Sequence, residues 1–269
     1  MGRCEGKVAL VTGAARGQGR AHAVRLAEEG ADIIAADICR PVDTVTYAGA
    51  SSDDLAETTA LVEKTGRHIL AREVDVRDLM GLTQLVADGV AEFGRLDIVV
   101  ANAGIMTAGR LWELSPEQWN EVIGVNLTGV WNTIKATVPV LIDQGEGGSV
   151  ILTSSVAGLV GQPFVGHYAA SKHGVVGLCR SLANELGEYN IRVNSVHPVG
   201  VNTEMVKDTD LFALITDHAT TLAPVFMNTL PFDFIEPEDV AGLVAFLASD
   251  EAKFMTGSQV PIDLGTLTR

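Results

Sequence analysis

Residues 7–19 read KVALVTGAARGQG, and they indicate how the whole chain folds. Lys7–Thr12 is apolar and partly β-branched, as is typical of a strand buried on both faces of a parallel sheet. Glycines follow it at once, and an apolar pattern with helical spacing then runs to Gly30. In this order, a glycine turn lets the backbone approach a pyrophosphate, which rests at the positive N-terminus of the helix. The residues expected to hold a dinucleotide here are Gly13, Arg16, Gly17, Gln18 and Gly19.

The next strand, expected at Asp32–Ala36, is followed by an acidic residue, Asp37. A carboxylate about 20 residues beyond the glycine turn can accept both hydroxyls of an adenosine ribose, and its charge repels a 2′-phosphate. Asp37 therefore favours NAD over NADP. Two alternatives stay open: Arg16 or Arg40 could reach a phosphate, and the acid could instead cap a helix.

The alternation of strand and helix continues to the end of the chain. It implies a Rossmann-type, doubly wound parallel sheet of about seven strands with helices on both faces. At 269 residues the chain fits this α/β fold as a single domain, residues 1–269. Further strands are expected at 69–74, 96–101, 149–154, 191–196 and 258–262, and further helices at 53–66, 78–93, 115–141, 165–187 and 238–248.

Small or polar residues stand at the carboxyl ends of several expected strands, the edge at which open α/β sheets bind ligands. They are Asp75-Val76, Asn102-Ala103-Gly104 and Ser155. Asn126 is unusual in another way, because it lies in the middle of the helix expected at 115–141, where its helix propensity is poor. We expect it to be either exposed or used for a polar task.

The helix expected at 165–187 contains the sequence Tyr168-Ala-Ala-Ser-Lys172. Residues four apart share one face of a helix, so the phenol and the ammonium group point the same way. A cation beside a phenol favours the phenolate and lowers the pKa of the tyrosine, which makes a usable proton acceptor near neutral pH. Taken alone, such a pair is more often a packed tyrosine and a snorkelling lysine.

The composition argues against several kinds of partner. The formal net charge of −15 disfavours nucleic acid and anionic membrane surfaces, and no run of about 18 apolar residues could span a bilayer. Three distant cysteines without a Cys-x-x-Cys pair suit a reducing cytoplasm, and the six histidines lack the spacing of metal ligands. We therefore expect a cytoplasmic protein with no metal site and no signal peptide.

Residues 199–236 are hydrophobic but poorly patterned, with many Phe, Leu and Met side chains. A mobile apolar lid over the substrate site would explain this composition, and it would suit a terpenoid, steroid-like or other hydrophobic alcohol. The alternative is an apolar loop that packs on a neighbouring subunit.

Taken together, these motifs resemble the short-chain dehydrogenase/reductase family over essentially the whole chain. The motifs that carry the resemblance are Thr12-Gly13-x-x-x-Gly17-x-Gly19, Asn102-Ala103-Gly104, Asn126, Ser155 and Tyr168-x-x-x-Lys172. The resemblance implies that Tyr168 is the general acid/base, that Ser155 binds the substrate oxygen, and that Lys172 lowers the pKa of the tyrosine. Asn126 would hold a water that relays protons from the lysine.

The resemblance also implies a place for the cofactor. Asp37 would bind the adenosine ribose, and Asp75 and Val76 would flank the adenine. Thr203 would contact the carboxamide end, although the family has a glycine directly after Pro198 and this chain has Val199 there. The remaining residues implied beside the cofactor are Asn102, Ala103, Gly104, Tyr168 and Lys172.

Within the family, the long loop after Asp37 and the wording of the glycine turn resemble carveol-dehydrogenase-like enzymes, many of them associated with the redox cofactor mycofactocin. In that subgroup the insertion is thought to cover the NAD, which an external redox acceptor regenerates in place. The resemblance implies an NAD-dependent oxidoreductase that interconverts a hydrophobic, terpenoid-like secondary alcohol and its ketone, and a homotetramer. An NADPH-dependent ketoreductase of the acyl-carrier type and a non-catalytic NAD-binding scaffold are the alternatives.

Overall fold

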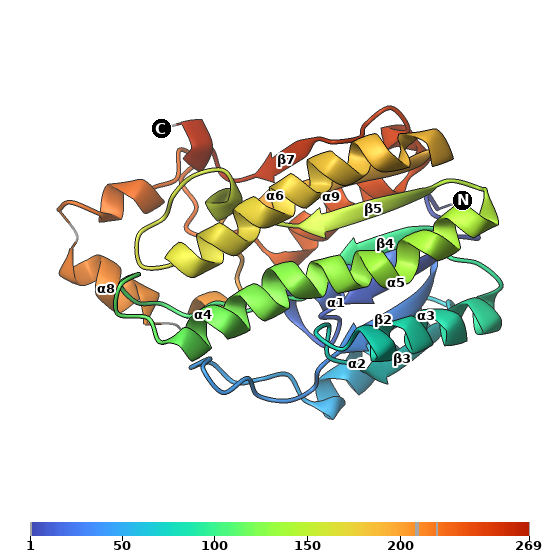
Figure 1. Cartoon of the computed structure of the whole chain (residues 1–269), viewed down its shortest axis with the longest axis horizontal. Coiled ribbons are helices and arrows are strands. Elements are labelled where there is room, and N and C mark those ends of the chain that lie inside the picture. Colours follow the sequence, from blue (N-terminus) through green and yellow to red (C-terminus); the bar gives the residue numbers. More distant parts are fainter. Residues whose placement is uncertain (1, 208–209, 219, 269) are drawn as a thin grey trace.

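A sheet of seven parallel strands forms the centre of the protein (Figure 1). The computed structural model describes residues 2–207, 210–218 and 220–268. The strand order is β3-β2-β1-β4-β5-β6-β7, which confirms the doubly wound topology predicted from the sequence. The strands are β1 (Val8–Thr12), β2 (Asp32–Asp37), β3 (Ile69–Glu73), β4 (Ile98–Ala101), β5 (Gly148–Thr153), β6 (Ile191–Pro198) and β7 (Gln259–Ile262).

Helices cover both faces of the sheet, and each layer encloses its own apolar core. Helices α1, α2 and α9 pack on one face, and α3, α5 and α6 pack on the other. The helices of the two layers are α1 (Gly17–Glu28), α2 (Ser52–Lys64), α3 (Leu79–Phe93), α4 (Pro116–Ile123), α5 (Gly129–Gln144), α6 (Gly166–Leu186) and α9 (Pro237–Ala248). No helix among the described residues is long and apolar enough to cross a membrane.

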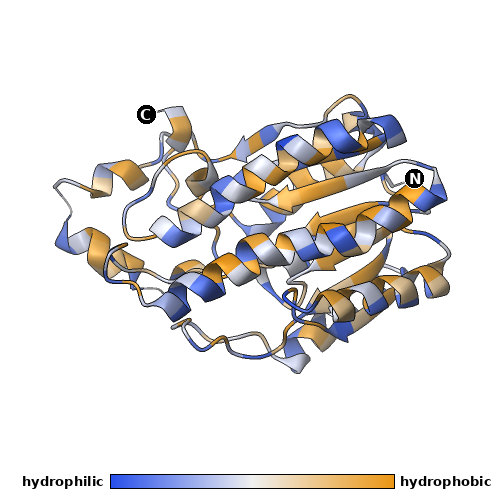
Figure 2. Cartoon of the chain, in the orientation of Figure 1, coloured by the Kyte–Doolittle hydropathy of each residue, from blue (hydrophilic) through white to orange (hydrophobic). Residues whose placement is uncertain are grey.

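The middle strands are apolar because both of their faces are covered. Every residue of β1 and β4 is buried, and Figure 2 shows hydrophobic strands lying between helices of mixed hydropathy. Burial of one side chain such as Leu10 or Ile34 stabilises the fold by about 1.5–3 kcal/mol. The strand predicted at 96–101 to be central, because of its unbroken apolar run, is the middle one of the seven.

Three local differences from the sequence predictions have clear causes. The helix predicted at 53–66 begins at Ser52, because Ser51 caps it and forms a reciprocal capping box with Asp54. β6 continues to Pro198 because β7 pairs with it that far. The helix predicted at 115–141 is split into α4 and α5 by a π-helical turn at Gly124–Thr128, and Asn126 lies in that turn.

Two irregular segments lie beyond the carboxyl ends of the strands (Figure 1). Residues 38–51, which we call the strap, follow β2 directly. Residues 199–236, which we call the lid, contain α7 (Glu204–Lys207) and α8 (Leu211–Asp217), neither of which has a buried residue among those described. A β-bridge between Val201 and Ile235 holds the two ends of the lid together. Residues 208, 209 and 219 of the predicted lid lie outside the described residues.

Candidate active site

A cavity of about 850 Å³ opens at the carboxyl edge of the sheet, between the strap and the lid. β1 pairs with both β2 and β4, so the direction in which the sheet is wound changes at this point. Such a switch point leaves a crevice at the carboxyl ends of the strands. The cavity lining includes all of the predicted cofactor residues and, of the predicted catalytic ones, Ser155, Tyr168 and Lys172.

The glycine turn is packed too closely for side chains. Gly13 and Gly17 have positive φ values of 67° and 53°. A Cβ on Gly13 would lie 2.8 Å from Ala103 Cα, and one on Gly19 would lie 1.8 Å from the Gly13 carbonyl oxygen. The absent side chains leave backbone N–H groups at the start of α1 free to face an anion, so the turn fits the pyrophosphate of a dinucleotide.

The segment after β4 forms hydrogen bonds with Thr12, directly before the glycine turn. The Thr12 hydroxyl oxygen accepts hydrogen bonds from the backbone N–H groups of Asn102 and Ala103, at 3.0 and 3.1 Å. The Asn102 amide donates in return to the Thr12 carbonyl, at 3.0 Å. The predicted Asn-Ala-Gly motif is therefore part of the scaffold that fixes the cradle.

Asp37 ends β2 and is turned toward the glycine turn. Its carboxylate is 8% exposed and accepts hydrogen bonds from the N–H groups of Ala15, at 3.0 Å, and Cys39, at 3.1 Å. The helix-capping alternative is wrong, because Ser51 caps α2. The acid thus lies where the adenosine ribose of a dinucleotide in this crevice would rest.

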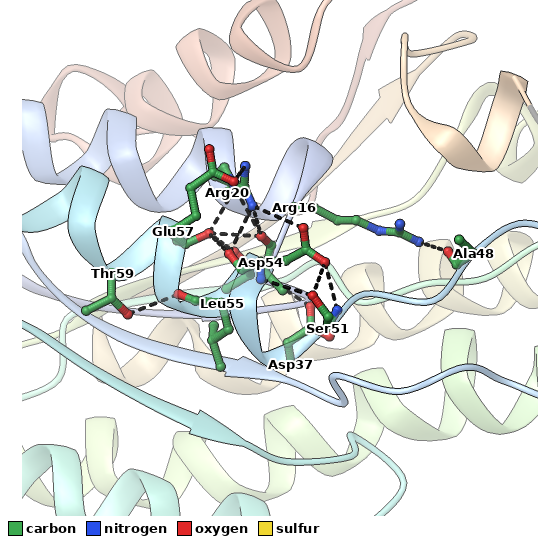
Figure 3. Close-up of polar contacts among 12 residues, drawn as sticks. Arg16, Arg20, Asp37, Ala48, Ser51, Asp54, Leu55, Glu57 and Thr59 are labelled. Atoms are coloured by element: carbon green, nitrogen blue, oxygen red, sulfur yellow. Dashed lines mark hydrogen bonds and ion pairs between the residues drawn. The ribbon is translucent and has the colours of Figure 1, made fainter.

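The two arginines that could have bound a phosphate are engaged elsewhere. Figure 3 shows Arg16 reaching from the glycine turn to the carbonyl oxygen of Ala48 in the strap. Arg40 pairs with Asp75 at 3.3 Å. This arrangement leaves the carboxylate of Asp37 as the charged group at the end of β2, which disfavours a 2′-phosphate there.

Asp75 and Val76, which were predicted to flank the adenine, line the cavity. Burial alone would raise the pKa of Asp75, but hydrogen bonds from Arg77, the shortest at 2.7 Å, outweigh it and leave that pKa below its usual value. Val76 is buried against Gly129 of α5, where a Cβ would come within 2.5 Å of the valine. The glycine on α5 thus lets Val76 pack closely against this helix.

The strap crosses the cavity and is attached on its far side. The Tyr47 hydroxyl accepts a hydrogen bond from the N–H of Met106, at 3.3 Å, and its ring is buried. The backbone N–H of Thr44 donates to Glu121 of α4, at 3.1 Å. Together with the contact from Arg16 to Ala48 and the ion pair of Arg40 with Asp75, these bonds attach the strap around the crevice.

Tyr168 and Lys172 lie on one face of α6, as predicted, and face the cavity. The lysine Nζ is 5.5 Å from the centre of the tyrosine ring and donates to the Thr153 carbonyl at the end of β5, at 2.8 Å. Lys172 is only 2% exposed, so the snorkelling alternative is wrong. Ser155 follows β5, and its side chain is close enough to the phenol to favour a lower pKa of Tyr168.

The pKa values of this pair differ from the sequence expectation. Burial raises the pKa of Tyr168 to about 12, and the side chain of Ser155 opposes that rise. Burial lowers the pKa of Lys172 to about 8. In the chain by itself, burial therefore changes the pKa of Tyr168 more than the nearby lysine does. Both groups lose hydration, and each is driven toward its neutral form.

Asn126 is buried and its amide is fully used. Its Oδ1 accepts from the N–H of Ile105 at 2.8 Å, and its Nδ2 donates to the Ile105 carbonyl at 2.9 Å and to the Ser171 hydroxyl at 3.2 Å. Of the two expectations for this residue, the polar task is confirmed. Its side chain fixes the chain after Gly104, where a Cβ would lie 3.5 Å from both the Asn126 Oδ1 and the Lys172 Nζ.

Thr203 lies over the glycine turn, because a Cβ on Gly17 would come within 3.1 Å of the threonine Cγ2. The lid beyond it brings apolar side chains to the cavity. Those that line the cavity include Leu211, Phe212, Ile215, Phe226, Met227 and Phe234. Among the described residues, no group of three or more His, Cys, Asp or Glu side chains could hold a metal ion.

Sequence reasoning missed two residues at this site. Tyr47 is the one aromatic side chain of the strap, and a lone aromatic residue in a long polar loop is a signal that could have identified it. His197 is buried directly before Pro198 and contacts the Ser155 carbonyl, at 2.7 Å. This contact depends on a strand pairing that the sequence does not specify.

The fold and this constellation define a Rossmann-type oxidoreductase. Residues 13–266 match the protein family described as enoyl-(acyl carrier protein) reductase. The chain belongs to the short-chain dehydrogenase/reductase family, as its motifs suggested.

Several relatives match over the full length of the chain. An uncharacterised NAD-dependent oxidoreductase of Mycobacterium tuberculosis is 54% identical over 99% of this chain and 98% of that protein. The (−)-trans-carveol dehydrogenase of Rhodococcus erythropolis is 46% identical over 99% of both. Carveol dehydrogenase of Mycobacterium avium, whose crystal structure is a complex with NAD, is 48% identical and superposes with a TM-score of 0.95 over 100% of both chains.

Proposed function

We propose that the protein is an NAD-dependent dehydrogenase that interconverts a hydrophobic secondary alcohol and its ketone, with Tyr168 as the general acid/base. The observation that carries the proposal is the position of the Tyr168 phenol. It lies in the wall of the cavity, where the Ser155 side chain lowers its pKa and the Lys172 ammonium group is 5.5 Å from the centre of its ring. A non-catalytic scaffold would need the crevice but not this cluster.

The chain's own residues move and hold the proton. Tyr168 takes the proton of the substrate hydroxyl, and Ser155 donates a hydrogen bond to the substrate oxygen. NAD, when bound, supplies the hydride acceptor and a positive charge. Lys172, held by Thr153, adds a second positive charge that favours the phenolate. Asn126 keeps the backbone beside Lys172 in place, and we assign to this corner a water that returns protons to solvent.

Asp37 supports NAD over NADP. A 2′-phosphate bound in the crevice would meet its carboxylate, while Arg16 and Arg40 are tied to the strap and to Asp75. The NADPH-dependent ketoreductase of the acyl-carrier type remains the second candidate, because the matched family is described by a carrier-protein reductase. The ratio of rates with NADH and NADPH distinguishes the two.

The lid supports an apolar substrate. Its Phe, Leu and Met side chains line the cavity, and a relative named (−)-trans-carveol dehydrogenase acts, by its name, on carveol. We assign this chain a terpenoid-like or other hydrophobic secondary alcohol. The strap supports a cofactor that is held during turnover and regenerated by an external redox acceptor, mycofactocin in the subgroup that the chain resembles.

We also propose a homotetramer in the cytoplasm. Leu127, Trp131 and Leu178 form an apolar patch on α5 and α6, beside Gly174 and Gly177. We assign this patch to a contact between copies of the chain in a homotetramer. The free cysteines Cys4, Cys39 and Cys179 suit the cytoplasm.

The test is a substrate panel with purified protein. Nucleotide is first released and identified, and NAD or NADP is then supplied with cyclic terpene alcohols, sugars and charged hydroxy acids, with and without an artificial electron acceptor. We expect turnover with NAD and the apolar alcohols. Turnover confined to sugars or hydroxy acids would rule out the apolar pocket, and a preference for NADP would favour the ketoreductase.

A further inference from the structure

His197 joins two parts of the site that the proposed mechanism leaves unconnected. It lies on β6 directly before Pro198 and is fully buried. Its Nδ1 is 2.7 Å from the carbonyl oxygen of Ser155, and its Nε2 is 2.8 Å from the hydroxyl of Ser195. The imidazole therefore bridges the end of β5 and the middle of β6.

The partners of the ring determine its protonation. A carbonyl oxygen can only accept, so Nδ1 carries the proton and donates it to Ser155. Burial lowers the pKa of His197 to about 4, so the ring is neutral near neutral pH and Nε2 accepts from the Ser195 hydroxyl. The ring is thus fixed at both ends in one tautomer.

Ser155 is held by this end of β6 and by the turn that follows it, where the N–H of Gly158 also donates to the Ser155 carbonyl, at 2.9 Å. The Ser154 N–H donates to the Val196 carbonyl at 2.9 Å. The Ser155 hydroxyl lies 3.5 Å from the Pro198 carbonyl and accepts from the N–H of Ala157 at 3.1 Å. The Ser155 backbone is extended, with φ −168° and ψ 166°, and the chain turns into a short 3₁₀ helix immediately after it. His197 thus donates to the carbonyl of Ser155, the residue at which this turn begins.

We propose that His197 is a positioning residue: its Nδ1–H fixes the peptide after Ser155 and thereby aims the Ser155 hydroxyl at the phenol of Tyr168. The inference rests on the proposed function, in which Ser155 binds the substrate oxygen beside that phenol. The inference concerns the orientation of the Ser155 hydroxyl, so it can be tested without measuring turnover.

Two substitutions separate the two ends of the ring. In His197→Asn the amide nitrogen takes the place of Nδ1, so the donor to Ser155 is kept and the contact with Ser195 is lost. In His197→Gln the amide reaches the place of Nε2, so the contact with Ser195 is kept and the donor to Ser155 is lost. A residue that only fills space would respond alike to both.

The readout is the NMR signal of tyrosine labelled with carbon-13 at Cζ, which responds to the hydrogen bond of the phenol. The chain has three tyrosines, and Tyr168→Phe identifies the signal of Tyr168. We expect His197→Gln and Ser155→Ala to move this signal and His197→Asn to leave it unchanged. In the Ser155→Ala background, His197→Gln should move it no further, because His197 acts through Ser155.

Kinetics give the second readout. With an alcohol that the wild type oxidises, we expect His197→Gln to lower kcat by about ten- to a hundredfold, with NAD affinity unchanged and activity restored in His197→Asn.

The inference would be overturned by an unmoved Tyr168 signal in His197→Gln, by equal shifts in both variants, or by additive effects with Ser155→Ala. Should His197→Gln fail to fold, His197→Leu, which also lacks the donor, replaces it. A wild type without turnover would contradict the proposed function and leave the NMR test of His197 in force.

Discussion

The chemistry of single residues here depends on burial as much as on neighbours. Lys172 is a charged side chain in the core, and its pKa falls to about 8 for that reason. Tyr168, beside it, has its pKa raised to about 12 by the same loss of water. Near neutral pH the phenol is therefore neutral and the lysine is still mostly charged, and a second bound cation would shift the phenol further toward the phenolate.

The preference for NAD is expected to depend on Asp37. Asp37→Ser removes the charge that opposes a 2′-phosphate and one acceptor for the ribose. We expect the ratio of NADP to NAD affinity, measured by titration calorimetry, to rise at least about tenfold, which corresponds to about 1.4 kcal/mol. Asp53→Ser, at an exposed acid at the start of α2, is the matched control and should leave the ratio unchanged. An unchanged ratio in Asp37→Ser would remove the carboxylate from the account of specificity.

Buried histidines are expected to make the protein sensitive to acid. Burial lowers the pKa of His22 to about 3 and that of His197 to about 4, from 6.5. Below pH 6.5 the unfolded chain therefore binds protons that the folded chain does not. The free energy of unfolding should fall between pH 6 and pH 4 by about 1.4 kcal/mol per pH unit for each histidine.

Urea unfolding at several pH values measures this slope. His22→Gln should lower this slope by the amount that corresponds to about one proton, while His68→Gln, at an exposed histidine, should leave the slope unchanged. The same slope in wild type and His22→Gln would show that His22 is protonated in the folded state.

At the level of elements, the sequence predicted what periodicity and turn chemistry control. The strands, their order of appearance and the glycine turn were all predictable, because apolar runs and helix stops are local features. The π-helical turn at Asn126 was not, since it exists to place one amide against Ile105, more than twenty residues away. The course of the strap and the role of His197 were likewise unpredictable, because both depend on contacts between distant segments.

The strap is expected to control the escape of the cofactor. Tyr47→Phe keeps the buried ring but removes the oxygen that binds the N–H of Met106. Loss of one such hydrogen bond is worth about 0.5–1.5 kcal/mol, so NADH should dissociate about two- to tenfold faster. The decay of bound NADH fluorescence on dilution measures this rate. Tyr189→Phe, at a half-exposed surface tyrosine, is the control, and an equal rate in both variants would mean that the strap does not gate the crevice.

At the level of the whole molecule, the sheet gathers all of the chemistry at one edge. The carboxyl ends of β1, β2, β4, β5 and β6 line the cavity together with Tyr168 and Lys172 of α6, and residues of the strap and the lid line it as well. The faces of α5 and α6 that point away from the cavity take no part in this site, and the apolar patch lies on these faces.

We expect a homotetramer that uses this patch. Light scattering should give four times the 28.4 kDa mass of the chain. Trp131→Arg places a charge in the patch and should yield smaller species, whereas Trp112→Arg, at an exposed tryptophan near the lid, should not. A monomeric wild type would contradict the expectation.

The most direct test of the mechanism is a single turnover in the stopped-flow spectrometer. Protein loaded with NAD is mixed with an apolar secondary alcohol that the substrate panel has identified, and the near-ultraviolet absorbance of NADH is followed for wild type and Tyr168→Phe. We predict that the variant binds NAD as tightly as the wild type and forms NADH about 10²- to 10⁴-fold more slowly. Formation of NADH at the wild-type rate without the phenol would contradict the account.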